Sequence, residues 1–196
     1  MTKKIGIVIF TLGAVLLVLA SLLYFQNKAE SDKAGEEAER HLEEVISIIE
    51  ENIQNEDAAA ESEASQNPPA PMLDNYEYIG YMTVPALDLN LPVLSTWDEQ
   101  RLKISPCRQF GSSETDDLVV AAHNYKRHFG YLGSLQTGQQ VSFTDIKGNI
   151  NDYVVSKIDR VLPEEVDKVK DSGYPFVMYT CNLDWSKRIV VYCSRK

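Results

Sequence analysis

Three residues in the C-terminal half of the chain have the types that acyl transfer to sulfur requires. His123 ends the run "DLVVAAH", Cys181 ends the run "PFVMYTC", and Arg188 opens the run "RIVVYCS". A thiolate attacks carbonyl carbons, an imidazole moves protons, and a fixed guanidinium stabilises a developing oxyanion. Spacing alone leaves a plainer alternative open, because cysteines at strand ends often only pack and histidines in turns often face solvent.

The segments that must position these residues read as short strands separated by turns. From residue 76 onward, β-branched and aromatic residues gather in runs that favour strands. The runs are "YIGYMTVP", "LNLPVL", "DLVVAAH", "QQVSFTD", "DYVVSKIDRVL", "PFVMYTC" and "RIVVYCS". Many short strands at even spacing are typical of a closed barrel or a sandwich, and we predict a small all-β barrel with short helices. A strand that ends on a polar residue delivers that residue to the barrel rim.

The N-terminus predicts a membrane anchor. Residues 5–25 form 21 consecutive positions without a formal charge. A helix of that length spans about 32 Å, which is enough to cross a bilayer. The apolar region of a cleaved signal peptide is shorter, so we expect this span to be retained. Lys3 and Lys4 precede the span and an acidic segment follows it, which places the N-terminus in the cytoplasm and the rest of the chain outside.

An acidic segment separates the anchor from the barrel. It carries an apolar stripe at helical spacing, which favours a helix. The stripe consists of Leu42, Val45, Ile46, Ile49 and Ile53. We predict a solvated stalk helix with His41 on its surface, and a short coiled coil between copies is the alternative. Residues 55–71 are rich in Ala, Ser, Glu and Pro, a composition typical of a disordered spacer.

These segments divide the chain into three parts. We assign residues 1–27 to a cytoplasmic tip and transmembrane anchor, residues 28–75 to the acidic stalk and linker, and residues 76–196 to the folded domain. The formal net charge of −10 belongs to the stalk, because residues 28–67 hold 13 acids and 3 bases, a net of −10. The folded part is nearly neutral, which excludes the basic footprint of a nucleic-acid-binding domain.

Four ordered blocks of the folded domain resemble the sortases, membrane-anchored cysteine transpeptidases of Gram-positive bacteria. The blocks are "YIGYMTVPALDLNLPVL", "DLVVAAHNYKRHFGYLGSL", "GQQVSFTD" and "YTCNLDWSKRIVVYCSR". The resemblance covers residues 78–195 and implies an eight-stranded β-barrel. It also implies a histidine at the end of the fourth strand, a cysteine at the end of the seventh and an arginine on the eighth. These positions match His123, Cys181 and Arg188.

The same resemblance implies a reaction and its partners. Cys181 would attack the Thr–Gly bond of an LPXTG-like sorting signal on a surface protein and form a thioacyl enzyme. An amino group of a peptidoglycan precursor, or of a pilin, would then accept the acyl group. His123 would protonate the leaving amine and deprotonate the incoming one. Arg188, with the main chain near Thr180, would bind the peptide and stabilise the oxyanion. No cofactor or metal ion is implied.

The sequence departs from the usual sortase pattern in two places. The usual Thr-Leu-x-Thr-Cys appears as "VMYTC", which affects the subsite beside the nucleophile. The glycine that usually precedes the histidine is Ala122 here, which is also small. The segment "PEEVDKVKDSGY" is too short for the long insertion of the haem-protein-anchoring branch, and the lid sequence of pilin polymerases is absent before residue 76. We therefore expect a sortase without a lid.

Several other polar residues of the domain have two interpretations each. Cys107 and Cys193 either form a disulfide outside the cell or fill the core as small hydrophobic residues. His128, in a polar and basic turn, is a rival base to His123. Some relatives bind calcium through loop carboxylates, but we expect these acids to be solvated and predict no metal site. The acids are Glu114, Asp116, Asp117, Glu164 and Glu165.

Two other functions remain as alternatives. A cell-wall cysteine hydrolase also uses cysteine and histidine. Its usual order places the cysteine first, at the start of a helix, whereas His123 precedes Cys181 here. A non-catalytic β-domain on a stalk, such as an adhesin or a sensor ectodomain, would carry the same anchor, spacer and barrel.

Overall fold

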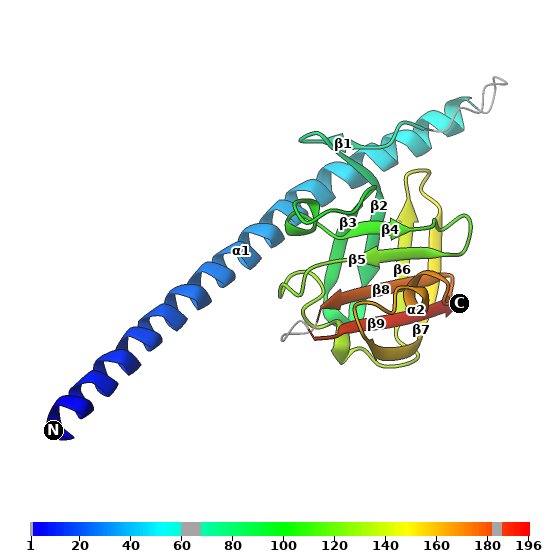
Figure 1. Cartoon of the computed structure of the whole chain (residues 1–196). Helices are drawn as coiled ribbons and strands as arrows, with labels where there is room; N and C mark the ends of the chain where they lie inside the picture. Colours follow the sequence, from blue (N-terminus) through cyan, green and yellow to red (C-terminus); the bar gives the residue numbers. More distant parts are fainter. Residues whose placement is uncertain (1, 60–67, 182–185) are drawn as a thin grey trace.

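A computed structural model describes residues 2–59, 68–181 and 186–196 of the chain. It consists of a β-barrel and one long helix, α1 (Thr2–Ala59), that lies along the outside of the barrel (Figure 1). The strands are β1 (Met72–Leu73), β2 (Tyr76–Val84), β3 (Leu89–Leu94), β4 (Cys107–Phe110), β5 (Leu118–Ala121), β6 (Gln140–Asp145), β7 (Ile150–Val161), β8 (Phe176–Cys181) and β9 (Arg188–Arg195). The short helices are η1 (Pro85–Leu87), η2 (Arg101–Lys103), η3 (Leu132–Ser134) and α2 (Asp167–Lys170).

Strands β2 to β9, eight of those in the described residues, close into a barrel. Their order is β2-β3-β4-β5-β8-β9-β7-β6, and β6 pairs back onto β2 to complete the circle. β3 is parallel to β4 and β5 is parallel to β8, whereas the other neighbours are antiparallel. The predicted eight-stranded all-β barrel is therefore confirmed. The seven runs identified in the sequence all form strands, and β4, with four residues, is too short to show a period of its own.

The part of the sheet made by β5, β8 and β9 is buried on both faces. The barrel interior contains Val120, Phe176, Met178, Val191 and Cys193. A second apolar layer on the outer face contains Val119, Ala121, Val177, Tyr179 and Val190, together with one residue each from η2 and α2. Because side chains alternate across a strand, the two sets interleave along each strand. Packing on both faces fixes the ends of these strands.

The C-terminal half of α1 packs on β2 and β3, so the prediction of a solvated stalk helix is wrong. Its buried residues recur every three or four positions and form what we call the docking seam. The docking seam consists of Ser31, Ala34, Gly35, Ala38, His41, Val45, Ile49 and Asn52. Only Val45 and Ile49 belong to the apolar stripe seen in the sequence, and Ile53 remains 38% exposed. Small and polar residues make up most of this contact, and a search for apolar residues at helical spacing does not detect them.

His41 lies inside the docking seam, which corrects its assignment to the helix surface. The residue is 2% exposed. Its Nδ1 lies 2.6 Å from the hydroxyl of Tyr78, and its Nε2 lies 3.1 Å from Oδ2 of Asp74. Both partners come from β2 or the turn before it, far from His41 in the sequence. Buried polar groups need such partners, and nothing on the helix itself reveals them.

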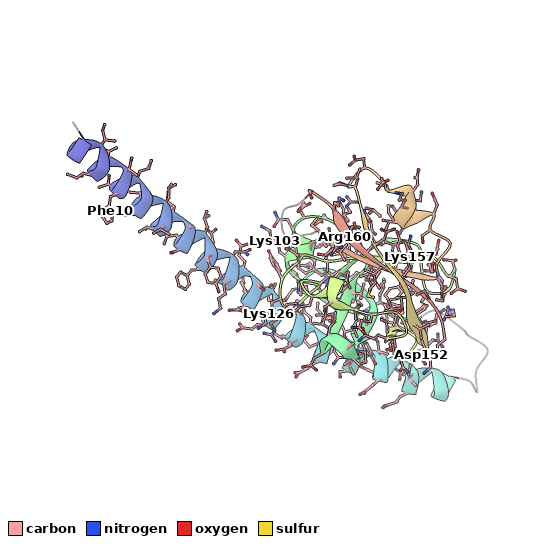
Figure 2. All side chains as sticks on the ribbon, turned by 90° about the horizontal axis from the view of Figure 1, so that it is seen from below. Phe10, Lys103, Lys126, Asp152, Lys157 and Arg160 are labelled. Carbon is pink, nitrogen blue, oxygen red and sulfur yellow. The ribbon has the colours of Figure 1, made fainter. Side chains whose placement is uncertain are left out.

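The N-terminal half of α1 extends away from the barrel (Figure 1). Within the described residues, α1 is the one helix that is long and apolar enough to cross a membrane, with a mean hydropathy of 2.7 in its most apolar window. Phe10, which lies far from the barrel in Figure 2, is 78% exposed. These properties suit a membrane anchor. The helix runs unbroken to Ala59, and the centre of the predicted disordered spacer, residues 60–67, lies outside the described residues.

Candidate active site

Cys181 and Arg188 face each other across an antiparallel ladder. Cys181 is the last residue of β8 and Arg188 is the first residue of β9. Their Cα atoms are direct partners in the β8–β9 pairing. Opposed residues of an antiparallel pair have Cβ atoms about 5 Å apart on the same face of the sheet. The thiol and the guanidinium therefore start from neighbouring positions.

His123 reaches the same row from the strand on the other side of β8. β5 and β8 are parallel, and Leu118 pairs with Phe176 and Ala121 with Tyr179. The Ala122 N–H continues this register by donating to the Tyr179 carbonyl at 3.2 Å. Continued past the end of the ladder, the same offset of 58 residues would place His123 level with Cys181.

The three side chains also share one face of the sheet. Ala121, Tyr179 and Val190 belong to the outer apolar layer, and the row of interest lies two residues from each of them. Since side chains two apart on a strand point to the same side, Cys181 and Arg188 extend this outer face to its end, and His123 would join them if the alternation continues for two residues past the end of β5. Thr180 points the other way: it is 1% exposed, and its Oγ1 has no hydrogen-bond partner in the part of the chain that the structure describes. Only the main chain of Thr180 can meet a ligand at this row.

Burial favours the uncharged forms of both titratable groups. His123 is half-buried, and desolvation lowers its pKa from the ordinary 6.5. Glu99 and Lys103, from the connection between β3 and β4, act on it in opposite directions, Glu99 raising the pKa and Lys103 lowering it. Burial raises the pKa of the Cys181 thiol above 9.0, and the charge of Arg188 opposes this shift. Nε2 of His123 is itself buried and has no hydrogen-bond partner among residues 2–59, 68–181 and 186–196.

Tyr179 holds the arginine of this row and was not recognised in the sequence as a site residue. The guanidinium carbon of Arg188 lies 5.2 Å from the centre of the Tyr179 ring, a cation–π contact. The Tyr179 hydroxyl donates to Oε1 of Gln109 at 2.6 Å, so β4 fixes the ring in turn. The strand period holds the signal that could have found it, because Tyr179 lies two residues before Cys181 and hence on the same face.

Comparison with known proteins identifies the family of the chain. The family model described as a sortase domain matches residues 82–196, more than half of the chain. The chain belongs to the sortase family. Sortase A of Bacillus anthracis is 26% identical over 199 residues, which cover 95% of this chain and 90% of that protein. Sortases are cysteine transpeptidases, so family membership favours an enzyme over the non-catalytic β-domain and the cell-wall hydrolase.

Solved sortase structures share the fold of this sortase. Sortase C1 from Streptococcus suis superposes with a TM-score of 0.54 at 22% identity, over 64% of this chain and 76% of that chain. Sortase C from Streptococcus pneumoniae gives a TM-score of 0.57 at 18% identity, over 80% of this chain and 95% of that chain. At these identities the structural matches establish the barrel architecture and no more.

His128 lies in a turn, as predicted, but its side chain is buried, which counts against the alternative that it serves as a rival base. It is fully buried, and desolvation lowers its pKa to about 4, so the ring is neutral at ordinary pH. Its ring centre lies 5.7 Å from that of Tyr125, whose ring centre lies 4.9 Å from that of His123. His128 therefore lies behind Tyr125 and has no access to solvent or substrate.

The two remaining cysteines of the sortase fill its cores. Cys107 and Cys193 are both free and both fully buried, so of the two alternatives the buried small hydrophobic residue holds and the disulfide does not. Cys107 belongs to the outer apolar layer, whereas Cys193 belongs to the barrel interior, so the sheet itself separates them. Burial raises the pKa of each thiol to about 12, which keeps both unreactive.

The loop acids of the sortase are engaged in ion pairs and turns. Glu114 pairs with Lys147 at 2.9 Å and Asp116 pairs with Arg195 at 2.7 Å. Within the described residues, no group of three His, Cys, Asp or Glu side chains could hold a metal ion.

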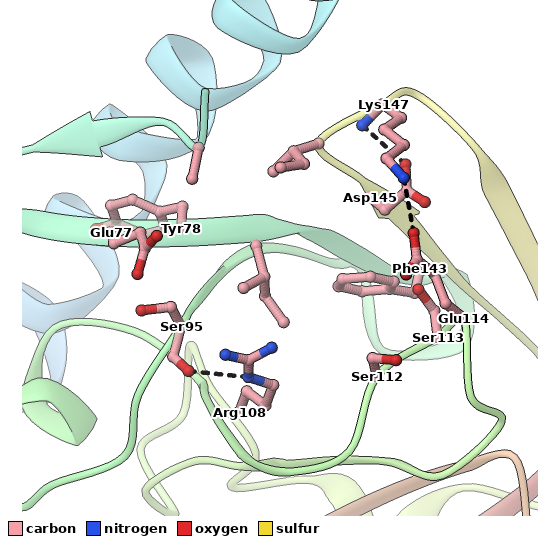
Figure 3. A pocket seen from close by; sticks show the side chains of 13 residues that line it. Glu77, Tyr78, Ser95, Arg108, Ser112, Ser113, Glu114, Phe143, Asp145 and Lys147 are labelled. Carbon is pink, nitrogen blue, oxygen red and sulfur yellow. Dashed lines mark hydrogen bonds and ion pairs between the residues drawn. The ribbon is translucent and has the colours of Figure 1, made fainter. Parts of the chain in front are cut away.

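A pocket of about 280 Å³ lies between β2, the loop after β4 and the β6–β7 turn (Figure 3). Its walls include Tyr78, Arg108 and Phe143, and the Arg108 Nε–H donates to the Ser95 carbonyl at 2.9 Å. His123, Cys181 and Arg188 are not among the residues that line this pocket.

Proposed function

We propose that this sortase cleaves an LPXTG-like sorting signal through a thioacyl intermediate on Cys181. His123 serves as the general acid and base, and Arg188 binds the peptide and the oxyanion. One observation supports the proposal: Cys181 and Arg188 are direct partners at the ends of β8 and β9, and His123 follows the end of the adjacent strand β5 by two residues. These three residues supply a nucleophile, a proton carrier and a fixed cation within reach of a single peptide bond.

The resting site holds an uncharged pair. Burial lowers the pKa of His123 and raises that of Cys181, so the neutral imidazole and the neutral thiol dominate near pH 7. The reaction starts when the proton of Cys181 passes to His123, because only the thiolate is nucleophilic. The charge of Arg188 lowers the pKa of Cys181 and so increases the small fraction of reactive thiolate.

The first half of the reaction forms the thioester. The thiolate adds to the carbonyl carbon of the threonine in the signal, and the oxyanion forms beside Arg188 and the main chain of Thr180. The imidazolium of His123 then gives its proton to the glycine nitrogen. The C–N bond breaks, the glycine fragment leaves as an amine, and the surface protein remains on Cys181.

The second half transfers the acyl group to an amine. The incoming amine adds to the thioester carbonyl and loses a proton to the neutral imidazole of His123. The C–S bond breaks, Cys181 leaves as a thiolate, and the proton on His123 restores the uncharged pair. The two halves use the same row in opposite proton states, which is what general acid and base catalysis by one histidine requires.

We assign the partners from the family and the anchor. The donor is a surface protein with a C-terminal LPXTG-like signal, and the acceptor is an amino group of a peptidoglycan precursor, with a pilin amine as the second candidate. Lys3 and Lys4 before the span support a cytoplasmic N-terminus and a catalytic domain outside the cell. The enzyme is thus a single-pass membrane protein in this proposal.

The test uses the full chain in detergent micelles with LPXTG peptides and two amines, a peptidoglycan-type peptide amine and a lysine peptide from a pilin. We expect cleavage between Thr and Gly and a new amide to one of the amines, detected by mass spectrometry. Cys181→Ala, His123→Ala and Arg188→Ala should lose the product while keeping the thermal unfolding of the parent. Product formation at the parental rate by the Cys181 variant would reject the assignment.

A further inference from the structure

The loop that follows His123 folds back on the histidine. The Phe129 N–H donates to the His123 carbonyl at 3.1 Å, and the N–H groups of His128 and Gly130 donate to the Tyr125 carbonyl at 3.0 and 2.9 Å. Residues 124–130 therefore form one compact unit, called the histidine loop below. Any element that holds the histidine loop also sets the position of the imidazole that precedes it.

A row of rings leads from the imidazole to α1. The ring of His123 lies against that of Tyr125, and the ring of Tyr125 lies against that of His128. His128 is fully buried, and the carbonyl of Ala34 in the docking seam acts on its ring to raise the pKa, against the larger effect of burial. Tyr125 also interacts with α1. Burial raises the pKa of its hydroxyl, and the nearby carboxylate of Glu30 raises it further.

α1 grips the histidine loop directly. The Oγ of Ser31 accepts the Lys126 N–H at 3.2 Å, and Figure 2 shows Lys126 beside the helix. A Cβ atom on Gly35 would overlap side-chain atoms of Arg127, so the glycine is what lets helix and loop approach this closely. One turn further on, Glu39 forms an ion pair with Arg127. A hydrogen bond, a close packing contact and an ion pair thus connect the histidine loop to nine consecutive residues of the helix, residues 31–39.

The histidine loop is also tied to the barrel core through the same helix. Ala38 of α1 and Phe129 of the histidine loop are both fully buried and belong to the same interior core cluster. The hydrogen bond from the histidine loop to Ser31 thus falls only six residues after the apolar span of residues 5–25 ends. The anchor and the proposed catalytic base are joined by one rigid helix.

We propose that the docking seam of α1 is a positioning element of the active site, with Ser31 and Gly35 as positioning residues that hold His123 through the histidine loop. This inference rests on the proposed role of His123. It adds to that role a part of the chain, the membrane-anchor helix, that touches neither the thiol nor the peptide. The anchor helix in this view belongs to the catalytic machinery as well as to the membrane.

The rival explanation is that the docking seam only stabilises the barrel. A purely structural seam would alter the thermal unfolding temperature and leave the rate of the chemical step untouched in the molecules that remain folded. A positioning role instead predicts a loss in kcat with little change in KM, since the peptide-binding groups are not displaced.

The experiment compares three variants of the full chain in detergent micelles. Gly35→Leu places a bulky side chain between the helix and the histidine loop and should push them apart. Ser31→Ala removes one hydrogen bond between them. Glu36→Leu is the control, because it places a leucine on the exposed side of the helix. We measure hydrogen exchange of residues 124–130, thermal unfolding, and kcat and KM on an LPXTG peptide. We expect faster exchange and about a 10-fold loss in kcat for Gly35→Leu, because displacing a catalytic group by about 1 Å can cost up to 100-fold. Ser31→Ala should lose about threefold, and Glu36→Leu should match the parent.

Three results would overturn the proposal. Unchanged exchange of residues 124–130 in Gly35→Leu would show that α1 does not hold the histidine loop. Faster exchange with an unchanged kcat would show that the hold is irrelevant to catalysis. An equal loss in Glu36→Leu would show that any change in the anchor has this effect. Full turnover by His123→Ala would instead reject the proposed role of His123, and the exchange result stands independently of that outcome. Should Gly35→Leu fail to fold, Ser31→Ala carries the same comparison.

Discussion

Thr180 and Cys181 are neighbours in the chain and lie on opposite faces of β8. Thr180 faces the barrel interior with Phe176 and Met178, whereas Cys181 continues the outer face of Val177 and Tyr179. The inner face is sealed and apolar, and its residues contribute stability. The outer face is equally apolar along the strand but ends in His123, Cys181 and Arg188. A single step along the strand thus separates a core position from the proposed nucleophile, which lies where the outer face reaches the rim.

The two cysteines on this pair of strands give the largest expected contrast. Cys181→Ala on the outer face should lower kcat/KM by roughly 10⁴-fold or more, because it removes the nucleophile. Its unfolding temperature should stay near that of the parent, since the residue is only half-buried. Cys193→Ala in the interior is the matched control: it should keep turnover and lose about 1 kcal/mol of stability. Peptide turnover and thermal unfolding of both variants check this, and equal turnover in the two would erase the contrast between the faces.

The two ends of β9 give the second contrast. Arg188→Gln should lower kcat by about 10²- to 10³-fold, the usual loss when an oxyanion partner is removed. Arg188→Lys should recover only part of this, because lysine lacks the planar fork of arginine. Arg195→Gln, at the far end of the strand and paired with Asp116, should turn over normally. Single-turnover rates measure all three, and a loss at residue 195 as large as that at residue 188 would contradict the assignment.

The pH profile tests the uncharged resting pair on the outer face. The reactive form carries a thiolate on Cys181 and a proton on His123. Because the pKa of His123 is lowered below 6.5 and that of Cys181 is raised above 9.0, kcat/KM should be flat between the two values. It should fall about tenfold per pH unit below the lower pKa, where thiolate is lost, and above the upper pKa, where the imidazolium is lost. A profile whose two limbs both fall between pH 6.5 and 9.0 would contradict the lowered pKa of His123 and the raised pKa of Cys181.

The smallest expected effect on kcat/KM comes from a comparison of two tyrosines, each of which makes a cation–π contact with an arginine. Tyr179→Leu on the outer face removes the ring below Arg188 and should lower kcat/KM by about fivefold, as expected for one cation–π contact. Tyr153 makes the same contact with Arg195 from a buried position at the other end of the sheet. Tyr153→Leu should lower the unfolding temperature and leave kcat/KM of the folded enzyme unchanged. Steady-state kinetics on both variants decide the point.

The strands and the rim residues could be predicted because their signals are local. Alternation along a strand and a polar residue at its end are visible within eight residues, as in "PFVMYTC". The register that brings His123 level with Cys181 is set by pairing between segments 58 residues apart, and no local pattern encodes it. The resemblance to a family supplied that step. Tyr179 was missed for a related reason: its partner Arg188 lies across a hairpin.

The helix that packs on the barrel could not be predicted from hydrophobicity. The apolar half of α1 is exposed to its surroundings, and the acidic half packs on protein through Ser31, Gly35 and Ala38. Small residues stabilise such a contact by letting the two elements approach closely rather than by burying a large apolar area. A hydropathy pattern therefore does not reveal them. The same holds for His41 and His128, which are buried because partners or neighbours from other elements enclose them. Each histidine is buried by residues that are distant in the sequence, whereas its neighbours in the sequence are polar and typical of an exposed position.

The central claim is that the sulfur at the end of β8 accepts the acyl group of a peptide. The most direct measurement is the mass of the full chain after brief mixing with an LPXTG peptide and acid quenching, followed by mapping of the modified cysteine. The account predicts one acyl group per molecule, attached to Cys181, in the parent, and none in His123→Ala. An acyl group on Cys107 or Cys193, or the same occupancy without the histidine, would contradict it.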